Sequence, residues 1–168
     1  TAGRSVVCVD RKGDGEYGIY VANYGGPTRF YEIENELIKD KAKNLNLDNI
    51  TGGRAVVSGH ILTERADIFA ANERGANFLF KNNNGKFDDV AFDYRLDDAI
   101  QNGRGTALSD IYYRGRLDIL SGNWLGYHRA WVLENNEFKD IGNKDFDEPS
   151  RIRTIISADF DNDGFDEV

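Results

Sequence analysis

The strongest signal for chemistry in the sequence is an acidic loop over residues 159–167, which reads Asp-Phe-Asp-Asn-Asp-Gly-Phe-Asp-Glu. Acidic side chains at loop positions 1, 3 and 5 point to one side of a tight turn, and the glycine at position 6 permits a sharp bend. The carbonyl at position 7 and the carboxylate at position 9 can complete a shell of about six or seven oxygens, which suits Ca²⁺ better than Mg²⁺. The predicted calcium ligands are Asp159, Asp161, Asp163, the carbonyl of Phe165, and Glu167.

An EF-hand begins with the same acidic pattern, but it needs a helix on either side and a bidentate Glu at position 12. Residues 153–158 form a β-rich run before the loop, and position 12 would lie beyond Val168. The sequence therefore favours a calcium loop between two strands. The alternative, an Asp- and Asn-rich turn that binds no ion, stays open.

Equivalent loops precede this one, and each has lost part of the acidic pattern. The carboxylates that remain in the first and third loops are Asp10, Asp14, Asp110 and Asp118. Lys12 stands at position 3 of the first loop and Arg114 at position 5 of the third, where a fixed positive charge can replace the ion. We therefore expect ion pairs in these two loops. The second loop, from His60 to Asp67, has lost the site altogether.

The acidic loop belongs to a repeat of about 50 residues. The successive repeats open at Gly3-Arg4, Gly53-Arg54, Gly103-Arg104 and Arg153. Each starts with a strand of small and β-branched residues, followed by a polar loop and a second strand that ends in Asn. A Gly-bearing turn, an aromatic-rich third strand and a short fourth strand complete the repeat. The recurring Asn predicts a turn in which its side chain bonds the backbone.

Four strands per repeat, without sustained helical periodicity, predict an all-β fold: a β-propeller segment of four-stranded antiparallel blades. The expected units are blades at 1–52, 53–102 and 103–151, and the first strand and calcium loop of a fourth blade at 152–168. A jelly roll or immunoglobulin-like sandwich would not explain the regular recurrence. Short helices could form only in the links around residues 41–47 and 94–100.

The repeat count predicts open sheet edges. The chain holds about three and a half blades, whereas propellers close with about four to eight. We therefore expect it to be a segment of a longer protein. Its edges would be covered by the remaining blades of the same propeller or by neighbouring chains, because exposed edges promote aggregation.

Charge and composition narrow the classes of partner. The 168 residues carry a net charge of −8, which argues against a nucleic-acid partner and an anionic membrane surface. No window is apolar enough for a spanning helix, so direct membrane insertion is not expected. With 40% hydrophobic residues the chain can bury a core. Cys8 is the only cysteine and lies in an apolar run, so we expect it to be buried.

The repeats resemble those of a known family. The acidic loop, together with Asn-Phe-Leu-Phe-Lys-Asn-x-x-Gly-Lys-Phe-x-Asp-Val at residues 77–90, is similar to the FG-GAP/VCBS repeat of integrin α-chain propellers. The resemblance runs along essentially the whole chain. It implies a propeller of about seven blades, secretion, and calcium in some of the blade loops. The resemblance predicts the fold more specifically than the molecular function.

The sequence offers no convincing catalytic set. It contains no G-x-S-x-G, H-E-x-x-H or phosphate-loop motif, and its two histidines, His60 and His128, are expected to be surface or capping residues. Paired carboxylates such as Asp88 and Asp89 are typical of solvated turns. The protein is therefore expected not to be an enzyme. An accessory or catalytic propeller of a polysaccharide-degrading enzyme, or a structural subunit of a larger assembly, is the alternative.

Recurring arginines and aromatic residues are the candidate contact groups. Arg4, Arg54, Arg104 and Arg153 could bind an anion as a ring, although pairing with carboxylates of their own or the adjacent blade is favoured. Trp131 is expected to pack between blades. The candidate ligand contacts, which flank one turn, are Trp124, Tyr127 and Arg129.

A possible glycosylation site, Asn49-Ile50-Thr51, lies in the link between the first two repeats. Together with a loop suited to extracellular calcium, it favours a secreted or cell-surface location. The function predicted from the sequence is a non-catalytic, calcium-binding propeller platform that mediates protein or glycan interaction and adhesion.

Overall fold

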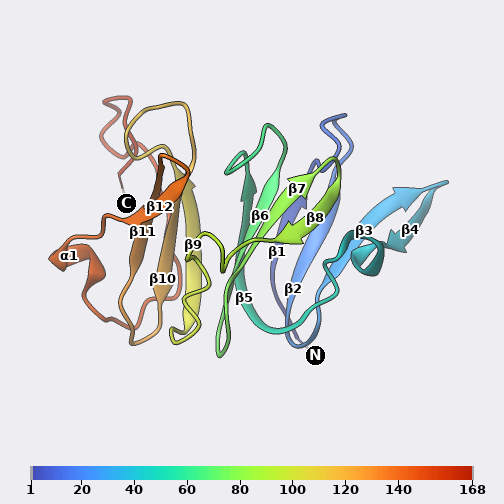
Figure 1. Cartoon of the computed structure of the whole chain (residues 1–168), viewed down its shortest axis with the longest axis horizontal. Helices are drawn as coiled ribbons and strands as arrows, with labels where there is room; N and C mark the ends of the chain where they lie inside the picture. The colour runs from blue at the N-terminus through green and yellow to red at the C-terminus, as the bar shows by residue number, and fades with distance from the viewer. Residues whose placement is uncertain (1, 168) are drawn as a thin grey trace.

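The computed structural model describes residues 2–167, which are built mainly from antiparallel strands (Figure 1). The first repeat contains β1 (Ala2–Val9), β2 (Gly18–Pro27), β3 (Arg29–Glu34) and β4 (Leu37–Asp40). The second contains β5 (Ile50–Gly59), β6 (Asp67–Asn72), β7 (Phe78–Asn83) and β8 (Lys86–Asp89). The third contains β9 (Gly103–Ser109), β10 (Asp118–Asn123), β11 (Arg129–Glu134) and β12 (Glu137–Asp140).

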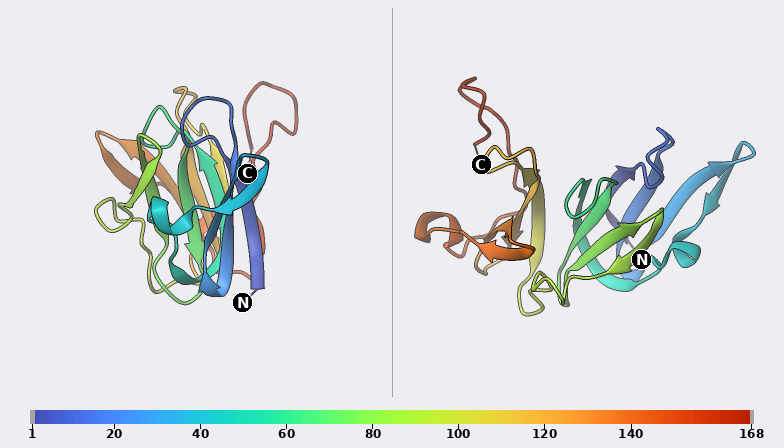
Figure 2. Two further views of the ribbon diagram at one scale, coloured as in Figure 1. Left: turned by 90° about the vertical axis from the view of Figure 1, so that its right-hand side faces the viewer. Right: turned by 45° about the horizontal axis from the view of Figure 1, so that its top comes forward.

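Each repeat forms one blade, a meander whose strands pair antiparallel in chain order. The first two blades are also joined, because β2 pairs with the start of β5 at Tyr24–Gly52 and Pro27–Ile50. Figure 2 shows the blades fanning out, and Figure 1 places the loops between first and second strands at the upper end. The predicted all-β class and partial β-propeller architecture are confirmed.

Helical structure is sparse in the described part of the chain. The link at 41–47 contains a 3-10 helix, η1 (Ala42–Leu45), whereas the link at 94–100 contains turns. The one-turn helix α1 (Lys144–Asp147) was not expected, and it begins where the Asn143 side chain accepts two backbone N–H groups. Within residues 2–167 no helix combines the length and apolar character needed to cross a bilayer.

The core lies between the blades. Every residue of β6 is buried, because its alternate side chains enter two different cores. Ile68 packs with Tyr20 and Phe80 between the first two blades, whereas Phe69 packs with Trp131 between the second and third. The Phe69 and Trp131 rings meet edge to face at 5.9 Å, which confirms the inter-blade position predicted for Trp131. Packing of sheet face on sheet face is what a propeller requires.

Residues 152–157 do not form the strand that was expected to open a fourth blade. Ile155 nevertheless packs on Leu120 and Ala130 in a third core, so the segment covers the outer face of the third blade. The expected partner strand would begin only at Glu167. The sole described pairing of this repeat is therefore the bridge between Ala158 and Glu167.

The prediction that Cys8 is buried is wrong. Cys8 is exposed, and Val6 beside it on the same strand keeps 64% of its accessible surface. Because side chains alternate along β1, Val7 and Val9 point toward the second blade while Val6 and Cys8 point the other way. No other blade covers that face among residues 2–167, so an apolar run does not ensure burial.

The recurring Asn organises the turn between the second and third strands, as predicted. Its side-chain amide donates a hydrogen bond to the carbonyl four residues later in all three blades. These bonds are Asn23 to Pro27 at 2.6 Å, Asn72 to Ala76 at 2.5 Å, and Asn123 to Tyr127 at 2.7 Å. They lie at the lower end of the blades in Figure 1.

His128 is a turn cap, one of the two roles expected for it, but it is buried rather than on the surface. Its Nδ1 accepts the backbone N–H of Asn123 at 3.0 Å, and its Nε2 lies 2.9 Å from the Ser150 hydroxyl. In the second blade the side chain of Asn77 accepts the N–H of Asn72 in the same way, also at 3.0 Å. Only 5% of His128 is exposed, and this burial lowers the pKa of the imidazole.

The glycines before Arg54 and Arg104 allow close approach between blades. A Cβ atom at Gly53 would lie 2.9 Å from the Asn23 carbonyl oxygen, and one at Gly103 would lie 2.8 Å from the Ala71 Cβ. At Gly3 the nearest atom would be 3.6 Å away, because no preceding blade packs there among the described residues. The Gly-Arg repeat is thus explained partly by packing.

We expect Gly103→Ala to lower the unfolding free energy of the chain by about 1 to 3 kcal/mol, because the new methyl group overpacks the contact between the second and third blades. Gly3→Ala is the matched control at the same repeat position, and it should change stability by less than about 0.5 kcal/mol. Denaturant unfolding measures both. Equal effects of the two substitutions would contradict the packing explanation.

We also expect His128 to make stability depend on pH. Burial lowers its pKa in the folded chain below the ordinary value of 6.5, so the unfolded chain binds the proton more readily. The stabilisation is complete above pH 6.5 and is lost as the pH falls toward the folded-state pKa. His128→Asn, which copies the cap at Asn77, should remove this dependence. Parallel unfolding curves from pH 7.5 to 5.5 measure the difference, and identical slopes would contradict it.

Candidate metal centre and arginine array

The acidic loop brings three of the predicted ligands together. Carboxylate oxygens of Asp159, Asp161 and Glu167 all lie within 4.8 Å of one another. Oxygens bound to one Ca²⁺ at about 2.3–2.6 Å can be at most about 5 Å apart, so these three groups fit one coordination shell. Asp163 is outside this group, and its carboxylate accepts the N–H of Phe165 at 2.9 Å.

Backbone hydrogen bonds give the loop its shape. The carboxylate of Asp159 accepts N–H groups from Asp163 at 3.0 Å and Gly164 at 2.8 Å. Gly164 has φ of +93°, the left-handed conformation that the predicted sharp bend requires. Reciprocal backbone bonds between Ala158 and Glu167, at 3.1 and 2.9 Å, close the ends of the loop. The first acidic residue therefore has a structural task in addition to any ligand role.

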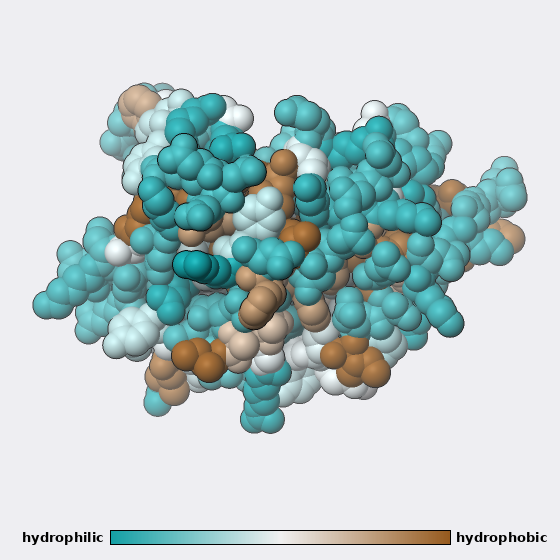
Figure 3. Space-filling view, in the orientation of Figure 1, coloured by the Kyte–Doolittle hydropathy of each residue, from teal (hydrophilic) through white to brown (hydrophobic). Residues whose placement is uncertain are grey.

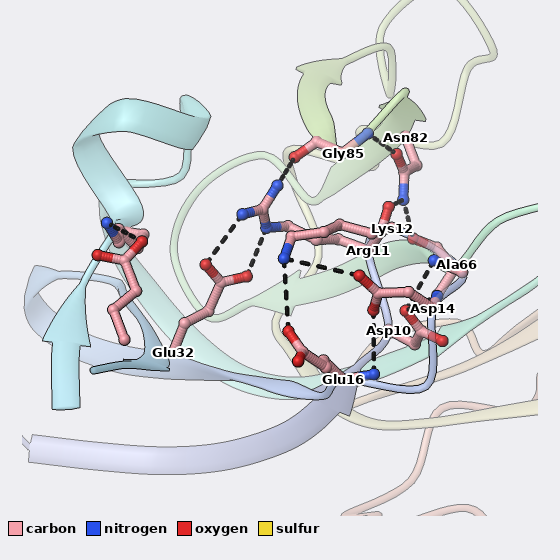
Figure 4. Close-up of polar contacts among 12 residues, drawn as sticks. Asp10, Arg11, Lys12, Asp14, Glu16, Glu32, Ala66, Asn82 and Gly85 are labelled. Atoms are coloured by element: carbon pink, nitrogen blue, oxygen red, sulfur yellow. Dashed lines mark hydrogen bonds and ion pairs between the residues drawn. The ribbon is translucent and has the colours of Figure 1, made fainter. Parts of the chain in front are cut away.

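The first loop keeps this backbone arrangement with a different set of charges (Figure 4). Asp10 accepts N–H groups from Gly13 at 2.7 Å and Gly15 at 2.8 Å, and these bonds lower the pKa of its carboxyl group. The Lys12 ammonium lies 3.7 Å from the Asp14 carboxylate and 3.6 Å from that of Glu16. The predicted ion pairs of this loop are present.

Arg11 is a residue of this loop whose role was not anticipated. Its guanidinium forms a two-bond pair with Glu32 and donates to the carbonyl of Gly85 at 2.9 Å (Figure 4). Asn82 donates in return to the carbonyl of Arg11 at 3.0 Å. The loop of the first blade is thereby fastened to the β7–β8 turn of the second. A single Arg offers no repeat signal from which this contact could have been predicted.

In the third loop an arginine takes part in the predicted ion pair. Asp110 caps the loop by accepting N–H groups from Arg114 at 2.8 Å and Gly115 at 2.5 Å. The Arg114 side chain contacts both oxygens of the fully buried Asp118, at 3.0 and 3.2 Å. Burial raises the pKa of Asp118, whereas the charge of Arg114 lowers it.

The second loop is held by backbone hydrogen bonds to a carboxylate, and none of its own basic side chains pairs with that carboxylate in the described structure. Asp67, which is fully buried, accepts backbone N–H groups from Leu62 at 2.7 Å, Thr63 at 2.9 Å and Asn82 at 2.7 Å. His60 is exposed at the start of this loop. The carboxylate at position 9 is thus retained as a backbone acceptor after the other acidic positions have changed.

The recurring arginines form one continuous row at the lower end of the blades, which we call the arginine array. Its members, in order, are Arg4, Tyr24, Arg54, Glu73, Arg104, Trp124 and Arg153. Each planar or acidic group follows a recurring Asn and lies between the arginine of its own blade and that of the next. The guanidinium carbons lie 5.8 and 4.7 Å from the Tyr24 ring centre, and 5.1 and 4.9 Å from that of Trp124.

Glu73 is the acidic member of the array. One carboxylate oxygen accepts from Arg104 at 2.8 Å, and the other contacts Arg54. The expected pairing of arginines with a carboxylate of their own or the adjacent blade therefore occurs at Glu73, whereas stacking on aromatic rings takes its place at Tyr24 and Trp124. The repeat pattern did not predict the role of Glu73, because the aligned residues Tyr24 and Trp124 are aromatic.

The three candidate ligand contacts have different surroundings. Trp124 is half-buried within the arginine array, and Tyr127 is 56% exposed. Arg129 is engaged with Asp98 at 3.3 Å and Asp140 at 2.9 Å, so its charge is already compensated. Among these three residues, Tyr127 and the exposed part of the half-buried Trp124 remain open to a partner.

Asn49 lies half-buried in the link just before β5, where its carbonyl accepts the N–H of Thr28 at 2.9 Å. The following residue, Ile50, is 77% exposed. The position lies in the inter-repeat link, as expected. Modification of Asn49 by a glycan stays a prediction.

Comparison with known proteins agrees with this architecture. Residues 110–168 match a family model described as an FG-GAP-like repeat. Over 96% of its length the chain is 45% identical to cartilage acidic protein 1 of Homo sapiens, 44% to that of Mus musculus and 43% to that of Xenopus tropicalis. The chain spans 27 to 28% of the length of these relatives, none of which is named as an enzyme.

The predicted resemblance to FG-GAP repeats is confirmed. Within that group, strings such as Gly122-Asn123-Trp124 followed by His128-Arg129 predict a likeness to cartilage acidic protein 1 and its microbial relatives. The likeness to cartilage acidic protein 1 is confirmed, and that to the microbial relatives stays a prediction. Residues 110–168 therefore match an FG-GAP-like repeat, and the chain is similar, over nearly its whole length, to about a quarter of cartilage acidic protein 1.

Proposed function

We propose that the chain is a non-catalytic, calcium-binding β-propeller platform of a secreted or cell-surface protein, which mediates contact with a protein or glycan. The calcium would be structural, holding the loop at 159–167 that leads from the first to the second strand of a blade. Candidate ligands are Asp159, Asp161 and Glu167, and the sequence pattern of the loop adds Asp163 and the Phe165 carbonyl.

The convergence of three exposed carboxylates carries the calcium proposal. Without a cation, charges within 4.8 Å of each other repel, and exposure does not remove this repulsion entirely. In the first and third loops, Lys12 and Arg114 lie beside the carboxylates that remain. In the described part of the acidic loop no basic side chain forms such a pair, so a bound ion would supply the missing positive charge.

The platform proposal draws on the architecture and on the relatives. Rigid blades, held by apolar packing between sheets, present turns and links at their ends, and such loops are the usual sites of recognition. The name of the relatives indicates a cartilage protein, which supports an extracellular setting for this chain. Loops of this kind fill at the millimolar calcium of the extracellular space.

We expect calcium removal to lower the melting temperature of the full-length protein, because the carboxylates of the acidic loop would then repel one another. Asp161→Ala should remove most of the difference between samples with calcium and with chelator. Asp14→Ala, an exposed acidic substitution in the first loop, is the matched control and should leave the difference intact. Calorimetry measures all three proteins. An identical melt with calcium and with chelator would refute the calcium proposal.

The platform role and the enzymatic alternative give different results with glycans. We expect the full-length protein to retain glycans on an array, or protein partners in a binding assay, without releasing shortened oligosaccharides. Tyr127→Ala, which removes an exposed ring, should weaken glycan retention by several fold if this turn contributes to binding. Chromatography of the incubated oligosaccharides detects turnover. Cleaved products that require this chain would overturn the non-catalytic proposal.

A further inference from the structure

Three arginines of the array, Arg4, Arg54 and Arg104, lie at a backbone irregularity that recurs in the first strand of the three blades. Gly3 pairs with Asn23 and Ser5 with Ala22, which leaves Arg4 as the extra residue of a β-bulge. Arg54 and Arg104 occupy the same bulged position in β5 and β9. A bulge redirects its side chain and disrupts the ladder locally, and such features usually serve a purpose. The bulges place Arg54 and Arg104 against the end of the preceding blade as well as their own, whereas Arg4 contacts Tyr24 of its own blade.

Positive charge is concentrated around Trp124. We define the Trp124 patch as Arg104, Trp124, Leu125, Arg151 and Arg153. Arg104 and Arg153 lie within about 5 Å of the Trp124 ring centre, and the backbone of Arg151 bridges to Trp124. Arg151 and Arg153 are exposed, and neither forms an ion pair with any residue between 2 and 167. This concentration stands out on a chain whose net charge is −8.

Arg104 is incompletely satisfied. It gives one N–H to Glu73, but its Nε is buried without a hydrogen-bond partner in the described structure. Burial and the neighbouring charges of Arg54 and Arg153 lower the pKa of its guanidinium. Glu73 is the only carboxylate paired with Arg54 and Arg104 in the described structure, and Arg153 stacks on Trp124 without one, so an additional anion at this end of the blades would be favoured.

Glu73 shows which anion the array accepts. Its carboxylate is held between Arg54 and Arg104, as each oxygen contacts one guanidinium. One blade further on, the aligned residue is Trp124, which brings no negative charge to Arg104, Arg151 or Arg153. We propose that the Trp124 patch binds an acidic polypeptide segment, whose carboxylates pair with these arginines as Glu73 pairs with Arg54 and Arg104.

Apolar side chains beside the patch match a polypeptide better than a sulfated glycan. Leu125 is 59% exposed and has φ of +59°, a left-handed conformation that is costly for this residue. Ile100, in the link next to the same turn, is 90% exposed. Figure 3 shows apolar groups along the lower edge of the molecule, whereas its upper loops are hydrophilic. In a peptide that alternates acidic and leucine-like residues, the acidic side chains would contact the arginines and the leucine-like side chains would contact Leu125 and Ile100.

This inference rests on the platform part of the proposed function and is independent of its calcium site. The test uses the full-length protein and a fluorescent eight-residue peptide of alternating Glu and Leu, with alternating Gln and Leu as the uncharged control. Fluorescence anisotropy should show binding of the Glu peptide alone, weakening as salt is added. Asp161→Ala should retain this binding, so failure of the calcium proposal is distinguishable from failure of this one.

Arg151→Gln combined with Arg153→Gln should weaken binding of the Glu peptide at least about tenfold, since two charge-assisted contacts are lost. Lys39→Gln combined with Lys43→Gln removes the same charge from exposed positions of the first blade and should change affinity less than about twofold. Equal weakening by both double variants would overturn the proposal. Absence of peptide binding, or binding of a heparin oligosaccharide in its place, would overturn it as well.

Discussion

Packing of one blade's face on the next is the interaction on which the rest of the molecule depends. A four-stranded meander cannot bury its own two faces, so β6 and β10 are buried at every residue only because a neighbour covers each side. The tight approach at Gly53 and Gly103 and the exposure of Cys8 follow from the same requirement. Apolar burial between sheets therefore sets both the fold and the relative placement of the loops.

Polar groups at the two blade ends use this framework in different ways. At the upper end, Asp10, Asp110 and Asp159 each accept N–H groups of their own loop, so the backbone keeps one shape while the charges around it change. At the lower end, the Asn turns hold the residues that alternate with arginines across the blades. At the upper end the Asp caps bond the backbone of their own loops, whereas at the lower end the arginine array links successive blades.

Features that depend on local repetition could be predicted from the sequence, and features that depend on packing could not. The meanders, the Asn turns and the bend at Gly164 recur at fixed spacing. The exposure of Cys8, the missing strand at 154–158 and the contact of Arg11 with Glu32 depend on which neighbour is present in space. Asp163 fits the acidic pattern, yet its carboxylate turns to the backbone of Phe165. The calcium ligand set and the domain limits remain predictions.

The first, third and fourth loops share a cap in which the first Asp accepts backbone N–H groups of its own loop. Asp10 and Asp110 accept backbone N–H groups in loops that also hold Lys12 and Arg114, as Asp159 does in a loop with acidic neighbours, so the same backbone cap forms with basic or acidic side chains around it. The net charge at this end of a blade can therefore change by substitution of the residues around the cap while the backbone of the loop is kept.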